Sequence, residues 1–208
     1  MRQDVFVEST GRTYGGLTPS QRSHERRVRF LEAGRALIAE EGVAPLTVDM
    51  VCERANVSKR YFYDEFSNKE DLFDACAEDM YTRLRTDMEK ALSDTPLAGR
   101  VNAALCSVIH ALGADPADAR LYMESPGFPR LRERQQRAVH EFATLMAQHA
   151  MPFTGRPKKT IDRQLGTRAL VAGTTDLIIA WLHGDIDTNE ETLIATITAA
   201  GLGAAEKL

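Results

Sequence analysis

Six residues between positions 58 and 64 carry polar side chains able to contact a nucleic acid. They are Ser58, Lys59, Arg60, Tyr61, Tyr63 and Asp64. A lysine ammonium or a hydroxyl can bind a backbone phosphate, whereas an arginine can donate two hydrogen bonds to the base edge of guanine. This combination indicates nucleic-acid binding rather than catalysis.

Two short helices joined by a tight turn are expected to present these residues. Thr47 and Ser58 are residue types favoured at helix N-caps, and each precedes apolar residues with helical spacing. Asn56, between them, tolerates the left-handed backbone that ends a helix. The segment 46–66 therefore predicts a helix-turn-helix, whose second helix has the build of a major-groove reader.

The exposed side of the second helix follows from its aromatic residues. Phe62 and Phe66 share one face, which places Arg60 and Asp64 at the centre of the opposite face. Asp64 could repel a phosphate, accept a hydrogen bond from cytosine, or pair with Arg60 four residues earlier. We expect the ion pair with Arg60.

This stretch closely resembles the DNA-binding segment of the tetracycline-repressor (TetR) family of bacterial transcription regulators. The resemblance covers residues 22–73, and beyond it only size and helical pattern are shared. The residues that carry it, in order and spacing, are Gly42, Thr47, Val48, Val51, Ala55, Val57, Ser58, Lys59, Tyr63, Phe66, Lys69, Glu70 and Leu72.

The resemblance implies roles for individual residues. It places Lys59 and Lys69 at phosphates, and Tyr63 at the position that donates its hydroxyl to the DNA backbone. Thr47, at a helix N-terminus, can add a hydroxyl and free amides to the same phosphate. Arg60 and Tyr61 stand where the family reads bases, the arginine on guanine and the tyrosine ring against a thymine methyl.

The rest of the chain contains helical patterns and no strand signal, which predicts an all-α protein of about nine helices. The first helix is expected over 23–41, with its arginines facing outward, and the fourth over 68–92. Later helices are expected at 96–112, at 115–125, between the loops at 126–129 and 152–159, at 160–183 and at 189–205.

Three regions are predicted from this organisation. Residues 1–21 form a flexible arm, which is either a disordered tail or, through Arg2 or Arg12, a minor-groove contact. Residues 22–67 form the helix-turn-helix DNA-binding domain. Residues 68–208 form a regulatory domain for ligand binding and dimerisation.

The last two helices carry more large apolar residues than one buried stripe needs, which favours an interface between subunits. The resemblance implies the same, because family members pair their last two helices into a four-helix bundle. Alternatively, these helices are the innermost ones of a monomer. The expected interface residues are Leu170, Leu177, Ile178, Trp181, Leu182, Leu193, Ile194 and Ile197.

A pocket for a small organic ligand is expected between the fourth and seventh helices, where large apolar side chains surround a few polar ones. Apolar side chains at helical spacing are also typical of an ordinary hydrophobic core. His110 and His149 are either polar anchors for the ligand or half-exposed helix residues. The candidate lining residues are Met80, Tyr81, Leu84, Met88, Cys106, His110, Tyr122, Met123, Phe128, Phe142, Met146 and His149.

Composition excludes several other classes. The net charge of −4 shows that the whole chain is no polycation, although residues 1–30 hold six arginines against three acidic residues.

The three cysteines are widely spaced and form no CxxC pair. We therefore expect no metal site, no disulfide framework and buried free thiols, with a redox switch as the alternative. No signal peptide is evident, and the most apolar stretch, 169–182, is interrupted by Gly173 to Asp176; we expect a cytoplasmic protein without a membrane span.

These observations predict a homodimeric, ligand-responsive regulator, most often a repressor in this family, on a palindromic operator. Its two reading helices would lie about 34–36 Å apart or a near multiple of that spacing. The alternative is a ligand-binding or protein-interaction module whose helix-turn-helix no longer reads DNA, since residues 22–70 hold nine basic and nine acidic residues. An enzyme is not expected, because no catalytic motif is present, and no cofactor is expected beyond an unidentified small-molecule effector.

Overall fold

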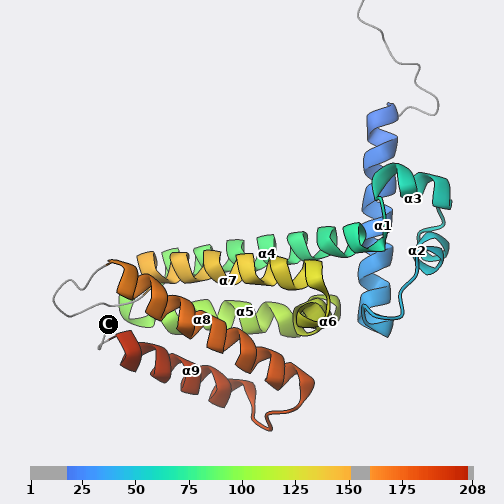
Figure 1. Cartoon of the computed structure of the whole chain (residues 1–208). Helices are drawn as coiled ribbons and strands as arrows, with labels where there is room; N and C mark the ends of the chain where they lie inside the picture. The colour runs from blue at the N-terminus through green and yellow to red at the C-terminus, as the bar shows by residue number, and fades with distance from the viewer. Residues whose placement is uncertain (1–17, 151–159, 206–208) are drawn as a thin grey trace, which may run out of the picture.

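The computed structural model describes residues 18–150 and 160–205. Over these ranges the chain forms α-helices and two 3-10 turns without a strand, which confirms the all-α prediction (Figure 1). Residues 1–17, with Arg2 and Arg12, and the predicted loop at 152–159 lie outside the described part of the chain. The elements are α1 (Pro19–Glu41), α2 (Val48–Ala55), α3 (Lys59–Glu65), α4 (Lys69–Asp94), η1 (Leu97–Gly99), α5 (Arg100–Ala114), α6 (Pro116–Glu124), η2 (Ser125–Gly127), α7 (Pro129–His149), α8 (Thr160–His183) and α9 (Glu190–Ala205).

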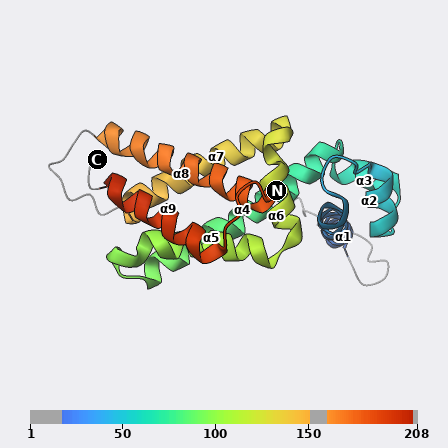
Figure 2. The same cartoon turned by 90° about the horizontal axis from the view of Figure 1, so that it is seen from below.

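The helices are arranged as a small head and an elongated body. Helices α1, α2 and α3 pack on one another in the head, and α4 leaves the head and runs along the body (Figure 1). In the body α4 packs against α5 and α7, α7 against α8, and α5 against α9. Seen from below, α8 and α9 lie on the near side of the body, and the C-terminus lies at the end far from the head (Figure 2).

Local signals explain where the head helices begin and end. Asn56 has φ 50° and ψ 48°, the left-handed stop that its residue type predicted. Asn68 accepts a hydrogen bond from the Asp71 amide at 2.9 Å and so caps α4. The predicted start of the first helix was wrong, because α1 begins four residues earlier at Pro19. Thr18 and Gln21 form a capping box there, and proline is favoured at a first helical position.

The core of the head holds the two recognition helices together. The Phe30 ring of α1 lies edge-on to Phe62 of α3, with ring centroids 5.3 Å apart, and 6.3 Å from Phe66. Phe30 and Phe62 have no exposed surface. Gly34 lets α4 approach α1, since a Cβ at that position would stand 3.1 Å from the Leu72 side chain. The aromatic cluster therefore fixes α3 against α1.

Two stretches are long and apolar enough to cross a membrane by length and composition alone, Leu97–Ala114 and Arg163–His183. Core helices of soluble proteins pass the same test. The first contains α5, which packs against α4, α6 and α9. The second is most of α8, of which only 11% is buried within one chain. Few residues of α8 are thus fully buried within the single chain.

Candidate nucleic-acid interface and apolar cavity

The turn between α2 and α3 presents the predicted reading residues to solvent. The residues exposed there are Thr47, Ser58, Lys59, Arg60, Tyr61, Tyr63 and Asp64. Thr47 caps α2, with its hydroxyl accepting from the Met50 amide at 3.3 Å. Ser58 occupies the N-cap position of α3, but its side chain makes no capping hydrogen bond, which leaves the hydroxyl available.

Arg60 and Asp64 do not form the ion pair expected from their spacing. Neither side chain makes an ion pair or hydrogen bond with any residue of 18–150 or 160–205. The physical reason is that both are exposed, where hydration replaces most of what an ion pair would gain. The Arg60 guanidinium is therefore free of a protein partner in the described chain and faces solvent in the first turn of the reading helix.

The two lysines differ in their surroundings. The Lys59 ammonium pairs with the Asp49 carboxylate, and this bond raises the pKa of Lys59. Lys69 donates to the Leu46 carbonyl at 2.9 Å, next to the α2 N-cap. Because an ammonium has three donors, Lys69 keeps protons for a phosphate beside Thr47. The structure thus brings Lys69 and Thr47 together, as the sequence predicts for a shared phosphate.

The arginines of α1 were predicted to face outward. Arg29 is exposed as predicted, whereas Arg26 and Arg27 are half-buried and fold back onto the head. The Arg26 guanidinium lies 4.6 Å from the centre of the Tyr61 ring, and Arg27 lies 4.5 Å from that of Phe66. Arg29 donates to the carbonyls of Ala55 and Asn56 at 2.5 and 3.2 Å, where α2 ends. Stacking on aromatic rings favours a folded-back arginine, and Arg29 caps free carbonyls. These cations fix α2 and α3 to α1 and orient Tyr61.

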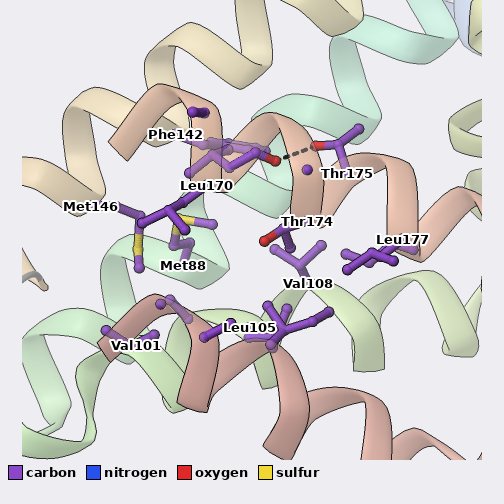
Figure 3. Close-up of a pocket in the computed structure, with 18 of the residues that line it drawn as sticks. Met88, Val101, Leu105, Val108, Phe142, Met146, Leu170, Thr174, Thr175 and Leu177 are labelled. Atoms are coloured by element: carbon purple, nitrogen blue, oxygen red, sulfur yellow. Dashed lines mark hydrogen bonds between the residues drawn. The ribbon is translucent and has the colours of Figure 1, made fainter. Parts of the chain in front are cut away.

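An apolar cavity of about 240 Å³ lies in the body between α4, α5, α6, α7, α8 and α9 (Figure 3). Figure 3 shows Met88, Val101 and Met146 toward one end, and Thr175 and Leu177 toward the other. Some lining residues of α8 and α9, such as Gly173 and Leu177, are also exposed to solvent. The mouth of the cavity therefore lies on the side of the body formed by α8 and α9. No aspartate, glutamate, lysine, arginine or histidine is among the described residues that line it.

Hydroxyl groups provide the polar part of the cavity wall. Tyr122 of α6 donates to the Thr175 hydroxyl of α8 at 3.3 Å, and Thr175 donates to the Val171 carbonyl at 3.0 Å (Figure 3). Thr174 adds a third hydroxyl. Burial raises the pKa of Tyr122 to about 12, so its hydroxyl keeps its proton at neutral pH.

The cavity only partly matches the predicted pocket. Met88, Tyr122, Phe142 and Met146 line it. The other candidates do not, since Met80, Tyr81 and Leu84 are packed into the core, and His110 and His149 are exposed. His110 contacts Glu190 at 2.7 Å. The remaining candidates that stay outside are Cys106, Met123 and Phe128.

A carboxylate cluster joins the head to the body between α1 and α6. Asp118 of α6 is buried and accepts from Arg35 of α1 at 2.7 Å and from Arg83 of α4 at 2.7 and 2.9 Å. Arg35 also binds Asp115 at 2.6 Å. Nearby, Glu124 accepts from the Val43 amide at 2.8 Å, just after α1 ends. Helix α6 therefore contacts both the cavity, through Tyr122, and the head.

The charge state of this junction follows from Asp115. Burial opposes its ionisation, but Arg35 and the amides of Ala117 and Asp118 outweigh burial and hold the pKa of Asp115 below its ordinary value of 3.8. A lowered pKa in the folded state contributes stability that is complete above the ordinary value and is lost as pH falls through the lowered one. The Asp115 carboxylate is therefore charged at neutral pH.

Comparison with known proteins identifies the head. The sequence profile of the bacterial regulatory proteins of the tetR family matches residues 30–76. These residues contain α2, α3 and the aromatic cluster that anchors them. Over these residues the chain is similar to the tetR family of bacterial regulatory proteins.

One curated protein and several solved structures are also similar to this chain. The uncharacterized HTH-type transcriptional regulator YhgD of Bacillus subtilis is 26% identical over 104 residues, which span 50% of this chain and 54% of that protein. A TetR transcriptional regulator from Streptococcus agalactiae has a TM-score of 0.66 at 17% identity, over 88% of this chain and 97% of that one. The multidrug binding protein EbrR, complexed with malachite green, has a TM-score of 0.65 at 23% identity, over 84% and 97% of the two chains. At these identities the structural similarity establishes the fold alone. The matched profile and YhgD both describe transcriptional regulators, not enzymes.

Four of the eight residues predicted for the subunit interface lie in the core of one chain instead. Ile178 is buried where α8 packs against α7 and α6, and Leu193, Ile194 and Ile197 are buried where α9 packs against α5. Leu177 remains exposed, and Leu170, Trp181 and Leu182 are half-buried. The outer faces of α8 and α9 instead expose Leu165 and many small residues, namely Ala169, Ala172, Gly173, Ala195, Ala199, Ala200 and Gly203.

The three cysteines of the chain are poor candidates for redox chemistry. Burial raises the pKa of Cys76 to about 12, and it also raises the pKa of Cys52 and Cys106. A thiol with a raised pKa is protonated at neutral pH and reacts slowly. Within the described ranges, no group of three histidine, cysteine or acidic residues is arranged to hold a metal ion.

Proposed function

We propose that this chain is a ligand-responsive transcriptional regulator that binds a palindromic operator as a homodimer. The observation that supports DNA binding best is the exposed, uncommitted Arg60 beside Tyr61 and Tyr63 on a firmly anchored helix. Lys59, Lys69, Thr47 and Ser58 surround this group and supply phosphate contacts. Repression is proposed because it is the usual role in the family, and the cytoplasm is the compartment where such a regulator meets DNA.

Replacing Arg60 with alanine should cost about 1–3 kcal/mol of binding free energy on the operator and relax specificity at one base pair. Replacing Lys69 should instead weaken binding to all sequences alike, because a phosphate contact carries no sequence information. Arg54→Ala is the matched control: Arg54 is an exposed arginine of the same head but is held by Glu40 at 2.5 and 2.9 Å.

Competition binding with operator variants changed at single base pairs would measure these effects. If Arg60→Ala weakened binding equally to the operator and to every single-base variant of it, a base contact by Arg60 would be contradicted. An Arg54→Ala variant that relaxed specificity as much would show that the reading residue is misassigned.

We propose that the second copy covers the outer faces of α8 and α9. Small residues let two helices approach closely, and exposed Leu165 and Leu177 add apolar area that water would otherwise hydrate. The 11% burial of the α8 window in one chain supports a subunit interface there.

Ala172→Glu should convert the dimer into a monomer, because a charge in a close helix contact would be buried without a partner. Light scattering after size-exclusion chromatography should give twice the 23.1 kDa chain mass for the parent protein and the single mass for the variant. Ala98→Glu, at an exposed alanine of η1, should leave the dimer intact. A dimeric Ala172→Glu variant would place the interface elsewhere.

We propose that the apolar cavity binds the effector, in keeping with a neighbour in fold, EbrR, that is described as a multidrug binding protein in complex with malachite green. Tyr122 reaches the cavity from α6. Asp118 of the same helix contacts α1, and Glu124 contacts Val43 in the segment after α1. A ligand that moves α6 would therefore bias the orientation of the head. Binding of effector and of DNA would then weaken one another reciprocally.

A further inference from the structure

We infer that the effector is an uncharged organic molecule with an apolar body and one hydrogen-bonding group, which the hydroxyls of Tyr122 and Thr175 receive. This inference rests on the proposed function, which makes the cavity between α5, α7, α8 and α9 the effector site, and it specifies the chemical class of the ligand.

The described residues that line the cavity include no charged side chain, which indicates an uncharged ligand. A carboxylate or an ammonium that enters the cavity loses its water and finds no side chain of opposite charge in that lining. Such a loss of hydration is far more costly for an ion than for a neutral polar group. Tyr122 cannot supply a negative charge either, because burial raises its pKa to about 12.

The geometry of the hydroxyls identifies the polar end of the ligand. The Thr175 proton is engaged with the Val171 carbonyl at 3.0 Å, so Thr175 offers only lone pairs. The Tyr122 hydroxyl reaches Thr175 at 3.3 Å, which is longer than the 2.7–2.8 Å usual between two hydroxyl oxygens. A ligand hydroxyl or carbonyl oxygen can therefore take the Tyr122 proton over a shorter distance. One neutral oxygen satisfies this site.

The opposite end of the cavity fits an apolar body. Met88, Val101 and Met146 lie away from Thr175 (Figure 3), and methionine side chains adapt to irregular apolar shapes. The volume of about 240 Å³ falls just below the range of about 300–1,000 Å³ typical of drug-sized ligands. A compact molecule with a short alkyl or ring body is expected.

Three probes with the same alkyl chain separate the charge classes: 1-octanol, octanoate and octyltrimethylammonium. Calorimetric titration of the full-length protein at neutral pH should show octanol binding at least about tenfold more tightly than either ion. Phe142 and Tyr122 present aromatic rings, which attract cations, so the ammonium probe tests the strongest rival class. Tighter binding of either ion, or no binding of octanol, would overturn the inference.

Tyr122→Phe and Thr175→Val test the polar end without changing the shape of the cavity. Each should weaken octanol binding about three- to tenfold, the usual effect of losing one neutral hydrogen bond. Tyr81→Phe is the matched control: its ring centroid lies 6.2 Å from that of Tyr122, but it does not line the cavity. Unchanged affinity in both test variants, or an equal loss in Tyr81→Phe, would contradict the assignment.

The titrations contain no DNA, so their outcome is separate from that of the regulator itself. Octanol binding in a protein that fails to bind any duplex would support the ligand class and refute the proposed regulator. Operator binding by a protein that prefers an ionic probe would support the proposed regulator and refute the inferred ligand class.

Discussion

Phe62→Ala should lower the free energy of unfolding by about 3–5 kcal/mol, the range for removing a fully buried phenylalanine. Phe62 has no exposed surface, and its ring contacts those of Phe30, Phe66 and Tyr63 at centroid distances of 5.3–5.5 Å. These contacts are what hold α3 to α1. The variant should therefore lose operator binding together with stability.

Tyr63→Ala is the control for this prediction, because Tyr63 follows Phe62 on the same helix but is 57% exposed. It should change stability by about 1 kcal/mol or less, while weakening DNA binding through loss of the phosphate contact proposed for Tyr63. Urea unfolding followed by circular dichroism would measure both variants. Equal destabilisation by the two changes would show that the aromatic cluster does not anchor the reading helix.

Asp118→Ala should destabilise the protein by about 2–3 kcal/mol. Breaking a buried ion pair typically costs about 3–5 kcal/mol because a charge is left without its partner. Here the Arg83 side chain is 41% exposed and recovers part of its hydration, which lowers the expected cost. The variant would leave the positive charges of Arg35 and Arg83 together at the junction between head and body.

Asp79→Ala removes another carboxylate that pairs with Arg83, but this one is exposed and lies one helical turn away. Its cost should be about 0.5 kcal/mol or less. Thermal and urea unfolding of the two variants should therefore differ clearly. If both lost the same stability, the buried cluster would contribute no more than a surface pair.

The head was largely predictable from sequence because its signals are local. Thr47, Asn56 and Asn68 act on their own helix ends, so residue type alone placed these boundaries. The start of α1 was missed because Pro19 was taken as a loop residue, although Thr18 before it and Gln21 after it form a capping box. The folding back of Arg26 and Arg27 depends on the relative placement of helices, which periodicity does not encode.

The cavity was less predictable because it depends on packing between distant helices. Burial of Met80 and Leu84 and exposure of His110 follow from the rotation of α4 and α5, which sequence spacing does not determine. Thr174 and Thr175 were visible as polar residues in the most apolar stretch, a signal that could have indicated a cavity wall on α8. Ile178 and Ile197 were assigned to the interface because apolar residues in core and interface look alike in sequence.

Binding of the purified protein to a random duplex pool and to its own upstream DNA, across a salt series, tests the central claim most directly. The proposed regulator should enrich a palindrome, and its affinity should fall by roughly a thousandfold or more between 50 and 200 mM salt if six or more phosphates are contacted. Weak binding to every duplex, without enrichment and with little dependence on salt, would contradict DNA recognition by this chain.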